Sequence, residues 1–237
     1  MTNISEQTLA SLVTENHQSV TVLEKYNLDF CCKGKRTLAE ACKEKNLPLQ
    51  DILTELQLFT APEEKLQMPF ELMTAEQLIG YILIHHHFYV KQSMPTIYGH
   101  LEKVANKHGE SYPNMQVVLQ LFASISEEMT QHMQKEEMIL FPRIKEVEKF
   151  AADDNIAPTA SSYISGPINV METEHEHAGE LLYEIRRLTN NYTAPEGACT
   201  TFRVCLDELK AFEEDLHKHV HLENNILFPM AEKFIAV

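Results

Sequence analysis

The stretches HMQKEEMILFP at 132–142 and HVHLENNILFP at 219–229 decide the fold of this 237-residue chain. Each begins with a histidine, has a glutamate four residues later, and runs into Ile-Leu-Phe-Pro in the same register. The two first histidines are 87 positions apart, and a second pair, His87 and His175, is 88 positions apart. The chain therefore contains an internal repeat of one helix pair, and each copy carries residue types that bind metals.

The spacing of His and Glu inside each repeat has a physical reason. Residues four apart on an α-helix lie on one face, with their Cβ atoms about 5–6 Å apart, so both side chains can reach one metal. When two such helices face each other, their carboxylates can bridge a metal pair about 3.5–4 Å apart. One histidine from each remaining helix then gives each metal two nitrogens. The predicted ligands are His87, His132, Glu136, His175, His219 and Glu223.

The donor set indicates which metal to expect. Imidazole and carboxylate without thiolate suit iron or manganese, although affinity alone does not exclude zinc. We expect two iron ions, because a carboxylate-bridged pair is usually built for redox or diatomic-gas chemistry. The His-x-x-x-Glu spacing differs from the Glu-x-x-His of ferritin-like proteins, which argues against a ferroxidase. A lone His-x-x-x-Glu would be an ordinary surface ion pair, but two in one register with two matched histidines favour a metal site.

Around this repeat the apolar pattern predicts an all-α protein with a four-helix bundle. Thr74 and Gln77 form a capping box at the start of the first helix, and Pro167 and Pro195 suit the first turns of the third and fourth. The polar segment 151–167 is expected to cross between the second and third helices. The shared Ile-Leu-Phe-Pro is expected to pack in the core and to mark helix ends. The expected helices are 74–107, 111–149, 167–191 and 195–236.

We expect residues 1–60 to form a small helical domain and residues 61–73, which include two prolines, to form a linker. The bundle is then expected at residues 74–237. Within the small domain, helices are expected at Leu38–Lys45 and Leu49–Thr60, with a turn at Asn27–Lys35.

Composition limits the partners and the compartment. A net charge of −15 argues against nucleic acid and anionic membranes as partners. No apolar run is long enough to span a bilayer, and the N-terminus lacks the features of a signal peptide. Five cysteines without an export signal indicate reduced thiols, so we expect a cytoplasmic protein.

Cys31 and Cys32 are adjacent in the turn of the small domain, so they cannot share one face and at least one is expected to be accessible. Nearby Lys33, Lys35 and Arg36 would favour the thiolate, which suggests a functional thiol. The other cysteines, Cys42, Cys199 and Cys205, lie in helical patterns and are expected to pack.

Several other side chains compete for a place near the metals. In the run 85–87 at most one histidine is expected to point fully inward, and the repeat selects His87. His217 and His221 align with Thr130 and Gln134 and are expected on the solvated surface. Glu128 and Asp215, each one turn before a predicted ligand, are candidates to orient an imidazole or carry protons. Glu174, beside His175, is a candidate to approach the site from the side. For all three the simpler interpretation is an ordinary surface acid.

The segments LDFCCKG, FYVKQSMP, METEHEHAGELL and the two repeats together resemble the bacterial Repair of Iron Centres (RIC) family of iron–sulfur cluster repair di-iron proteins. The resemblance covers nearly the whole chain. It implies a short ScdA-type N-terminal domain and a hemerythrin-like bundle with a µ-oxo-bridged di-iron centre. The family's ligands fall on the six residues that the repeat selects. Its acidic residues near the iron pair fall on Glu128 and Glu174, and its paired cysteines on Cys31 and Cys32.

The resemblance also implies a function in stress caused by nitric oxide or peroxide. RIC proteins help to restore damaged iron–sulfur proteins, by giving up iron or by reducing nitric oxide at the iron pair, and a homodimer is common among them. Whether this chain is an enzyme stays open. The alternatives are a hemerythrin-like carrier or sensor of oxygen or nitric oxide, whose ligand set is typically asymmetric with an extra histidine, and an iron store.

Overall fold

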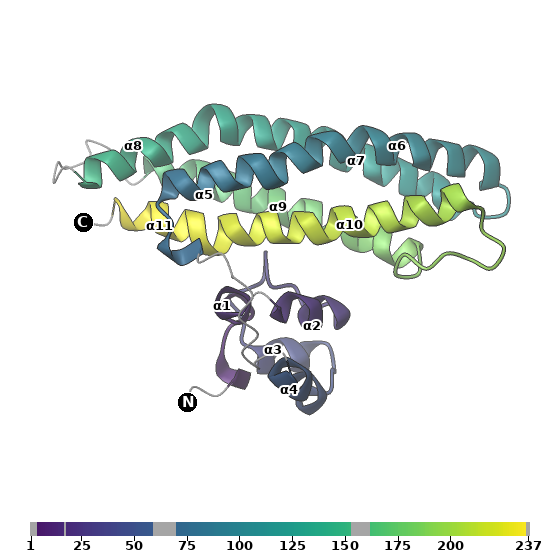
Figure 1. Ribbon diagram of the computed structural model, residues 1–237, viewed down its shortest axis with the longest axis horizontal. Coiled ribbons are helices and arrows are strands. Elements are labelled where there is room, and N and C mark those ends of the chain that lie inside the picture. Colours follow the sequence, from purple (N-terminus) through teal and green to yellow (C-terminus); the bar gives the residue numbers. More distant parts are fainter. Residues whose placement is uncertain (1–3, 17, 59–69, 153–161, 236–237) are drawn as a thin grey trace.

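The computed structural model describes residues 4–16, 18–58, 70–152 and 162–235. Four long helical rods form a bundle, and a domain of short helices lies along one side of it (Figure 1). Within the described ranges, no helix combines the length and apolar character needed to cross a bilayer. The bundle and the all-α fold agree with the sequence prediction. Most of the expected linker, 61–69, and much of the expected crossing, 153–161, lie outside the described residues.

Three of the four rods are interrupted by a five-residue π-helical segment. The first rod is α5 (Ala75–Ile82), η3 (Leu83–His87) and α6 (Phe88–His108). The second is α7 (Asn114–Lys135), η4 (Glu136–Leu140) and α8 (Phe141–Ala152). The third is α9 (Ser162–Leu188) alone. The fourth is α10 (Thr200–Leu222), η5 (Glu223–Leu227) and α11 (Phe228–Lys233).

The Ile-Leu-Phe-Pro segments lie where η4 and η5 return to α-helix. Phe141 and Phe228 are buried, as expected for core packing. The expectation that Ile-Leu-Phe-Pro marks helix ends is wrong, because the rods continue beyond it as α8 and α11. Pro142 and Pro229 have no N–H to donate and would clash with the carbonyl four residues earlier, so a wider π-turn before each proline lets the rod go on.

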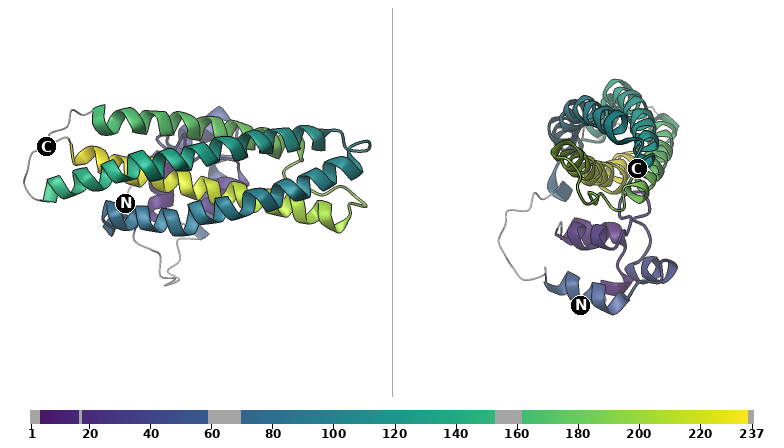
Figure 2. Two further views of the ribbon diagram at one scale, coloured as in Figure 1. Left: turned by 90° about the horizontal axis from the view of Figure 1, so that it is seen from above. Right: turned by 90° about the vertical axis from the view of Figure 1, so that its right-hand side faces the viewer.

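Two apolar clusters fill the bundle on either side of the π-helical segments. One contains Phe122 and Phe212 at the end where α6 meets α7, and the other contains Phe141 and Phe228 at the end where α8 meets α11. Viewed end-on, the four rods surround a common centre and the N-terminal domain stands outside them (Figure 2). Polar residues between the clusters are therefore shielded from water.

The starts of the third and fourth rods differ from the prediction by five residues each. The helix α9 begins at Ser162, so Pro167 lies inside it. Because Pro167 has no N–H to donate to the Tyr163 carbonyl, this carbonyl accepts a hydrogen bond from Arg143 Nη1 instead, at 3.0 Å. The helix α10 begins at Thr200, since Pro195 belongs to a turn that also contains Gly197 at φ 78°.

The N-terminal domain consists of η1 (Ile4–Glu6), α1 (Leu9–Glu15), α2 (Ser19–Lys25), α3 (Leu38–Glu44) and α4 (Leu49–Leu58). Thr37 and Glu40 form a capping box at the start of α3. Its loop between α2 and α3 rises toward α10 (Figure 1). At this interface the side chain of Phe30 is 1% exposed. Asn225 Nδ2 donates hydrogen bonds to the backbone carbonyls of Phe30 and Cys31 at 3.3 and 3.2 Å. The carboxylate of Glu24 in α2 lies 3.2 Å from His217 Nδ1.

Candidate metal centre

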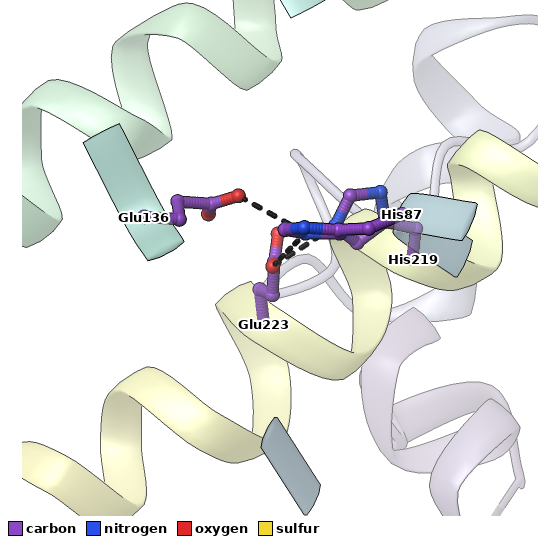
Figure 3. Close-up of side chains that lie close together, drawn as sticks. All are labelled: His87, Glu136, His219 and Glu223. Carbon is purple, nitrogen blue, oxygen red and sulfur yellow. Dashed lines mark hydrogen bonds and ion pairs between the residues drawn. The ribbon is translucent and has the colours of Figure 1, made fainter. Parts of the chain in front are cut away.

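The structure brings the six predicted ligand residues together at the centre of the bundle. They form two groups of four whose ligand atoms lie within 4.8 Å of one another. One group contains His87 and His219, the other His132 and His175, and both contain Glu136 and Glu223. All six are at most 1% exposed. Figure 3 shows the first group, in which the two carboxylates approach the imidazoles from different rods.

Each shared carboxylate offers one oxygen to each group. Glu136 Oε2 lies 3.3 Å from His87 Nε2, and its Oε1 lies 3.3 Å from His132 Nε2. Glu223 Oε1 lies 2.9 Å from His219 Nε2, and its Oε2 lies 3.2 Å from His175 Nε2. Two carboxylates arranged in this way can bridge two cations, each of which also receives two imidazole nitrogens.

Buried atoms without hydrogen bonds support this fit. Among the described residues, His87 Nε2, both oxygens of Glu136 and Glu223 Oε2 are buried and have no hydrogen-bond partner. Buried polar atoms are almost always paired, because leaving one unpaired costs about 1–3 kcal/mol. A pair of metal ions between the carboxylates would satisfy all of these atoms at once.

A second set of side chains orients three of the four imidazoles. The Nδ1 atoms of His87, His132 and His175 lie 2.8, 2.9 and 2.8 Å from oxygens of Glu137, Glu174 and Asn224. A carboxylate or amide oxygen at Nδ1 fixes the proton there, which leaves Nε2 free to bind a metal. Glu137 and Glu174 also pair with Lys91 and Lys135 near the surface.

Opposite charges act on the side chains of the cluster. Burial alone would lower the pKa of His87 and His132, but the neighbouring carboxylates raise both to about 10. Burial would raise the pKa of Glu223, yet the imidazoles of His219 and His175 hold it well below its usual range. A metal ion that binds here would therefore have to displace protons from His87 and His132.

Glu174, which was expected to approach the site from the side, lies 2.9 Å from His132 Nδ1, and this hydrogen bond lowers the pKa of Glu174 to about 2. Glu128 does not reach a ligand, since its carboxylate lies 3.4 Å from the exposed His177. Asp215 pairs instead with His86, at 3.0 Å.

His86 corrects the expectation that only one histidine of 85–87 points inward. It is 5% exposed, and its ring stacks on that of His219 with centroids 5.7 Å apart. The neighbouring ligand His87 is buried as well. A residue adjacent to an inward-pointing one can be buried here because Tyr81 packs against His86.

His217 and His221 are also not on the solvated surface. His221 is 3% exposed, and the ring of Phe30 packs edge-on against both, at 6.0 Å from His217 and 5.7 Å from His221. The expectation failed because the internal repeat predicts only which residues face the centre of the bundle, whereas the N-terminal domain covers this part of α10 from outside.

The paired cysteines lie at the same interface. Cys31 is buried and Cys32 is partly exposed, so one thiol is accessible as expected. The expected thiolate is wrong for Cys31, because its hydrogen bond with Cys32 and its burial raise its pKa well above the usual value. Of the other cysteines, Cys42 and Cys205 are buried, and Cys199 is partly exposed, 3.3 Å from His108.

Sequence reasoning missed Glu137 and Asn224, which directly follow the two bridging glutamates. Their signal was present, because the 87-residue offset that links His132 to His219 also links these two positions. Both carry a side-chain oxygen, and both accept from the imidazole of the rod beside them.

Comparison with known proteins agrees with this arrangement. The model of the hemerythrin HHE cation binding domain matches residues 78–231, and that of a domain of unknown function, DUF542, matches 5–59. The iron-sulfur cluster repair protein YtfE of Yersinia pseudotuberculosis is 37% identical over 95% of this chain and 96% of its own. Proteins of the same name from Shigella boydii and Cronobacter sakazakii are 34% and 35% identical over the same shares. The chain therefore belongs to the Repair of Iron Centres family, and its bundle is a hemerythrin HHE cation binding domain.

Proposed function

We propose that the chain holds two iron ions in its six-residue cluster and helps to restore iron–sulfur proteins damaged by oxidative or nitrosative stress. The observation that carries the proposal is the pair of shared carboxylates, each with one oxygen toward each histidine pair. The relatives named as iron-sulfur cluster repair proteins support the same function.

In this proposal His87 and His219 hold one iron, His132 and His175 hold the other, and Glu136 and Glu223 bridge them. The iron pair would supply both labile iron and a position for nitric oxide or another diatomic ligand. Imidazole and carboxylate ligands without thiolate suit iron, the ion that such a donor would supply.

Glu137 and Glu174 would handle the protons. Each lies between the Nδ1 of a cluster histidine and a lysine near the surface, and each has about a third of its side chain exposed. A carboxylate in that position can hold the imidazole while metal is bound and accept or return a proton when metal leaves. Glu128, which the resemblance places among the acids near the iron pair, lies farther out beside His177.

The N-terminal domain would connect the cluster to the recipient protein. We expect Cys31→Ser to retain the iron and to impair repair. A cytoplasmic location and a homodimer remain expectations from the sequence and from the family resemblance.

The first test is the metal content of protein purified without added metal, with Mössbauer spectroscopy. The proposal requires about two coupled irons per chain, and their loss in Glu223→Ala with most of the helix content retained. Glu146→Ala, on an exposed face of α8, serves as the matched control. A single zinc would contradict the iron pair.

The second test gives the iron-loaded protein to a dehydratase whose iron–sulfur cluster has been damaged. Recovery of dehydratase activity at the expense of the bound iron would support donation. Nitric oxide consumption without iron transfer would support reduction instead. Reversible oxygen binding with neither activity would favour a hemerythrin-like carrier.

A further inference from the structure

A second group of metal-binding side chains lies in the N-terminal domain, in the loop between α2 and α3. Asp29 Oδ1 accepts hydrogen bonds from the backbone N–H groups of Cys31, Cys32 and Lys33 at 3.1, 2.9 and 3.4 Å. These bonds fold the loop tightly around the carboxylate. As a result, two thiols that are adjacent in sequence come to lie beside one carboxylate, and the three ligand atoms are within 4.8 Å of one another.

The distances within this group fit a tetrahedral metal ion. The Sγ atoms of Cys31 and Cys32 are 3.7 Å apart, and Cys31 Sγ lies 3.3 Å from Asp29 Oδ1. Two thiolates bound to one tetrahedral ion at about 2.3 Å are separated by about 3.8 Å, and a thiolate and a carboxylate oxygen by about 3.5 Å. Little movement is therefore needed to form three bonds to one ion.

The group also faces open space. Asp29, Cys31 and Cys32 line a cavity of about 580 Å³ between the loop and the bundle, whose opposite wall includes Glu176 and Glu180 of α9. Gly179 stands between these glutamates, and a Cβ added there would lie 3.9 Å from Cys32 Sγ. The absent side chain leaves room beside the thiol, so a fourth ligand can enter from the cavity.

Most basic side chains around the cavity are paired with other residues that line it. Arg36 pairs with Glu44, Arg186 binds Glu213 and Asn27, and Lys45 donates to the Asn27 carbonyl. Glu176 and Glu180 on the bundle wall add negative charge to the cavity, which favours a cation there.

We propose that Asp29, Cys31 and Cys32 form a second metal site, which binds one thiophilic divalent transition-metal ion and leaves its fourth position open to the cavity. The site shares no residue with the six-residue cluster, and it stands whether or not that cluster serves repair. Its two sulfur donors select Zn²⁺, Co²⁺ or Fe²⁺ over Mg²⁺, Ca²⁺ and Mn²⁺. Binding replaces the two thiol protons, which leave as two H⁺, and no electron is transferred.

The test uses the full-length, iron-loaded protein under anaerobic, reducing conditions and adds Zn²⁺ as the probe. Equilibrium dialysis should show one additional zinc per chain. X-ray absorption at the zinc edge, which the bound iron does not obscure, should show two sulfur neighbours at about 2.3 Å. The double variant Cys31→Ser/Cys32→Ser should lose these neighbours, whereas Cys199→Ser should keep them.

Asp29→Asn separates ligation from folding, because the amide oxygen can still accept the backbone hydrogen bonds. We expect this variant to keep its helix content and to bind zinc about 10–100-fold more weakly. Zinc with only nitrogen and oxygen neighbours, or an unchanged sulfur signal in the double variant, would overturn the proposal. So would a wild-type protein that has both thiols reduced by titration and takes up no zinc.

Discussion

Glu174 and His86 occupy equivalent positions in the two halves of the repeat, and only Glu174 binds a cluster histidine. Each residue directly precedes a ligand, and the two positions are 88 residues apart. Glu174 lies 2.9 Å from His132 Nδ1. His86 stacks on His219 instead, and among the described residues His219 Nδ1 is buried without a hydrogen-bond partner. The two proposed iron positions are therefore supported unequally.

The first prediction is that a chelator removes the two irons at different rates, the iron on His219 leaving first. Replacing Glu174 by Ala should remove the support of His132 and speed the slow phase about 10–100-fold. Stopped-flow measurement of iron extraction checks this, with Glu176→Ala on the same helix as the control. A single extraction rate in the wild-type protein would contradict the asymmetry.

The second prediction concerns pH. The pKa values of His87 and His132 are raised to about 10, so both imidazoles carry an extra proton at neutral pH in the metal-free protein. Metal must displace these protons, so metal affinity should rise with pH up to about 10 and binding should release about two protons. Calorimetry in buffers with different ionisation enthalpies measures the number released.

The same two groups affect the stability of the metal-free protein. Because their folded-state pKa values lie above the usual 6.5, their stabilising effect is full below pH 6.5 and is lost as pH rises through about 10. Urea unfolding of the metal-free protein should therefore show decreasing stability from neutral to alkaline pH. A midpoint that stays constant over this range would show that the two imidazoles are not protonated.

The third prediction concerns Glu213, which is 3% exposed and accepts hydrogen bonds from Tyr192 at 2.7 Å and from Arg186 at 2.9 Å. Glu213→Ala leaves the Arg186 guanidinium, whose side chain is 15% exposed, with Asn27 but no carboxylate partner, and we expect the free energy of unfolding to fall by about 3 kcal/mol. Denaturant unfolding checks this. Glu214→Ala, next in sequence and paired with Lys210 on the surface, should change stability by less than about 1 kcal/mol.

The fourth prediction is that Phe30→Ala loosens the N-terminal domain from the bundle. Phe30 is buried against His217 and His221, and truncating a fully buried phenylalanine costs about 3–5 kcal/mol. A thiol reagent should then react faster with Cys31, while the helix content of the bundle stays. Phe88→Ala, at a position 63% exposed, is the control. An unchanged reaction rate would show that other contacts hold the domain.

The sequence predicted most of what depends on one helix pair and its repeat. The bundle, the capping box at Thr74 and the meeting of the six His and Glu residues all follow from helical periodicity and a constant offset. It did not predict the π-helical segments, because α- and π-turns differ by a single residue that the apolar pattern does not resolve.

Other failures arise from contacts between distant parts of the chain. His221 is buried because Phe30 covers it, and Pro167 lies within a helix because Arg143 binds the carbonyl that this proline leaves free. The positions of Glu128 and Asp215, one turn before a ligand, suggested that they face the metals, but each pairs with a histidine outside the six. Sequence spacing along one rod cannot show what packs against it.

Two adjacent asparagines of η5 connect the six-residue cluster to the N-terminal domain. Asn224 accepts from His175, and Asn225 donates to the carbonyls of Phe30 and Cys31. If an ion bound at the cluster fixes this π-turn in its present register, it also favours the docked domain, and thermodynamic reciprocity then requires the docked domain to favour the ion by the same factor. Under the proposed function, a recipient protein that pulls the loop of Phe30 and Cys31 away from the bundle would lower the affinity for iron on contact, and docking would act as the release signal.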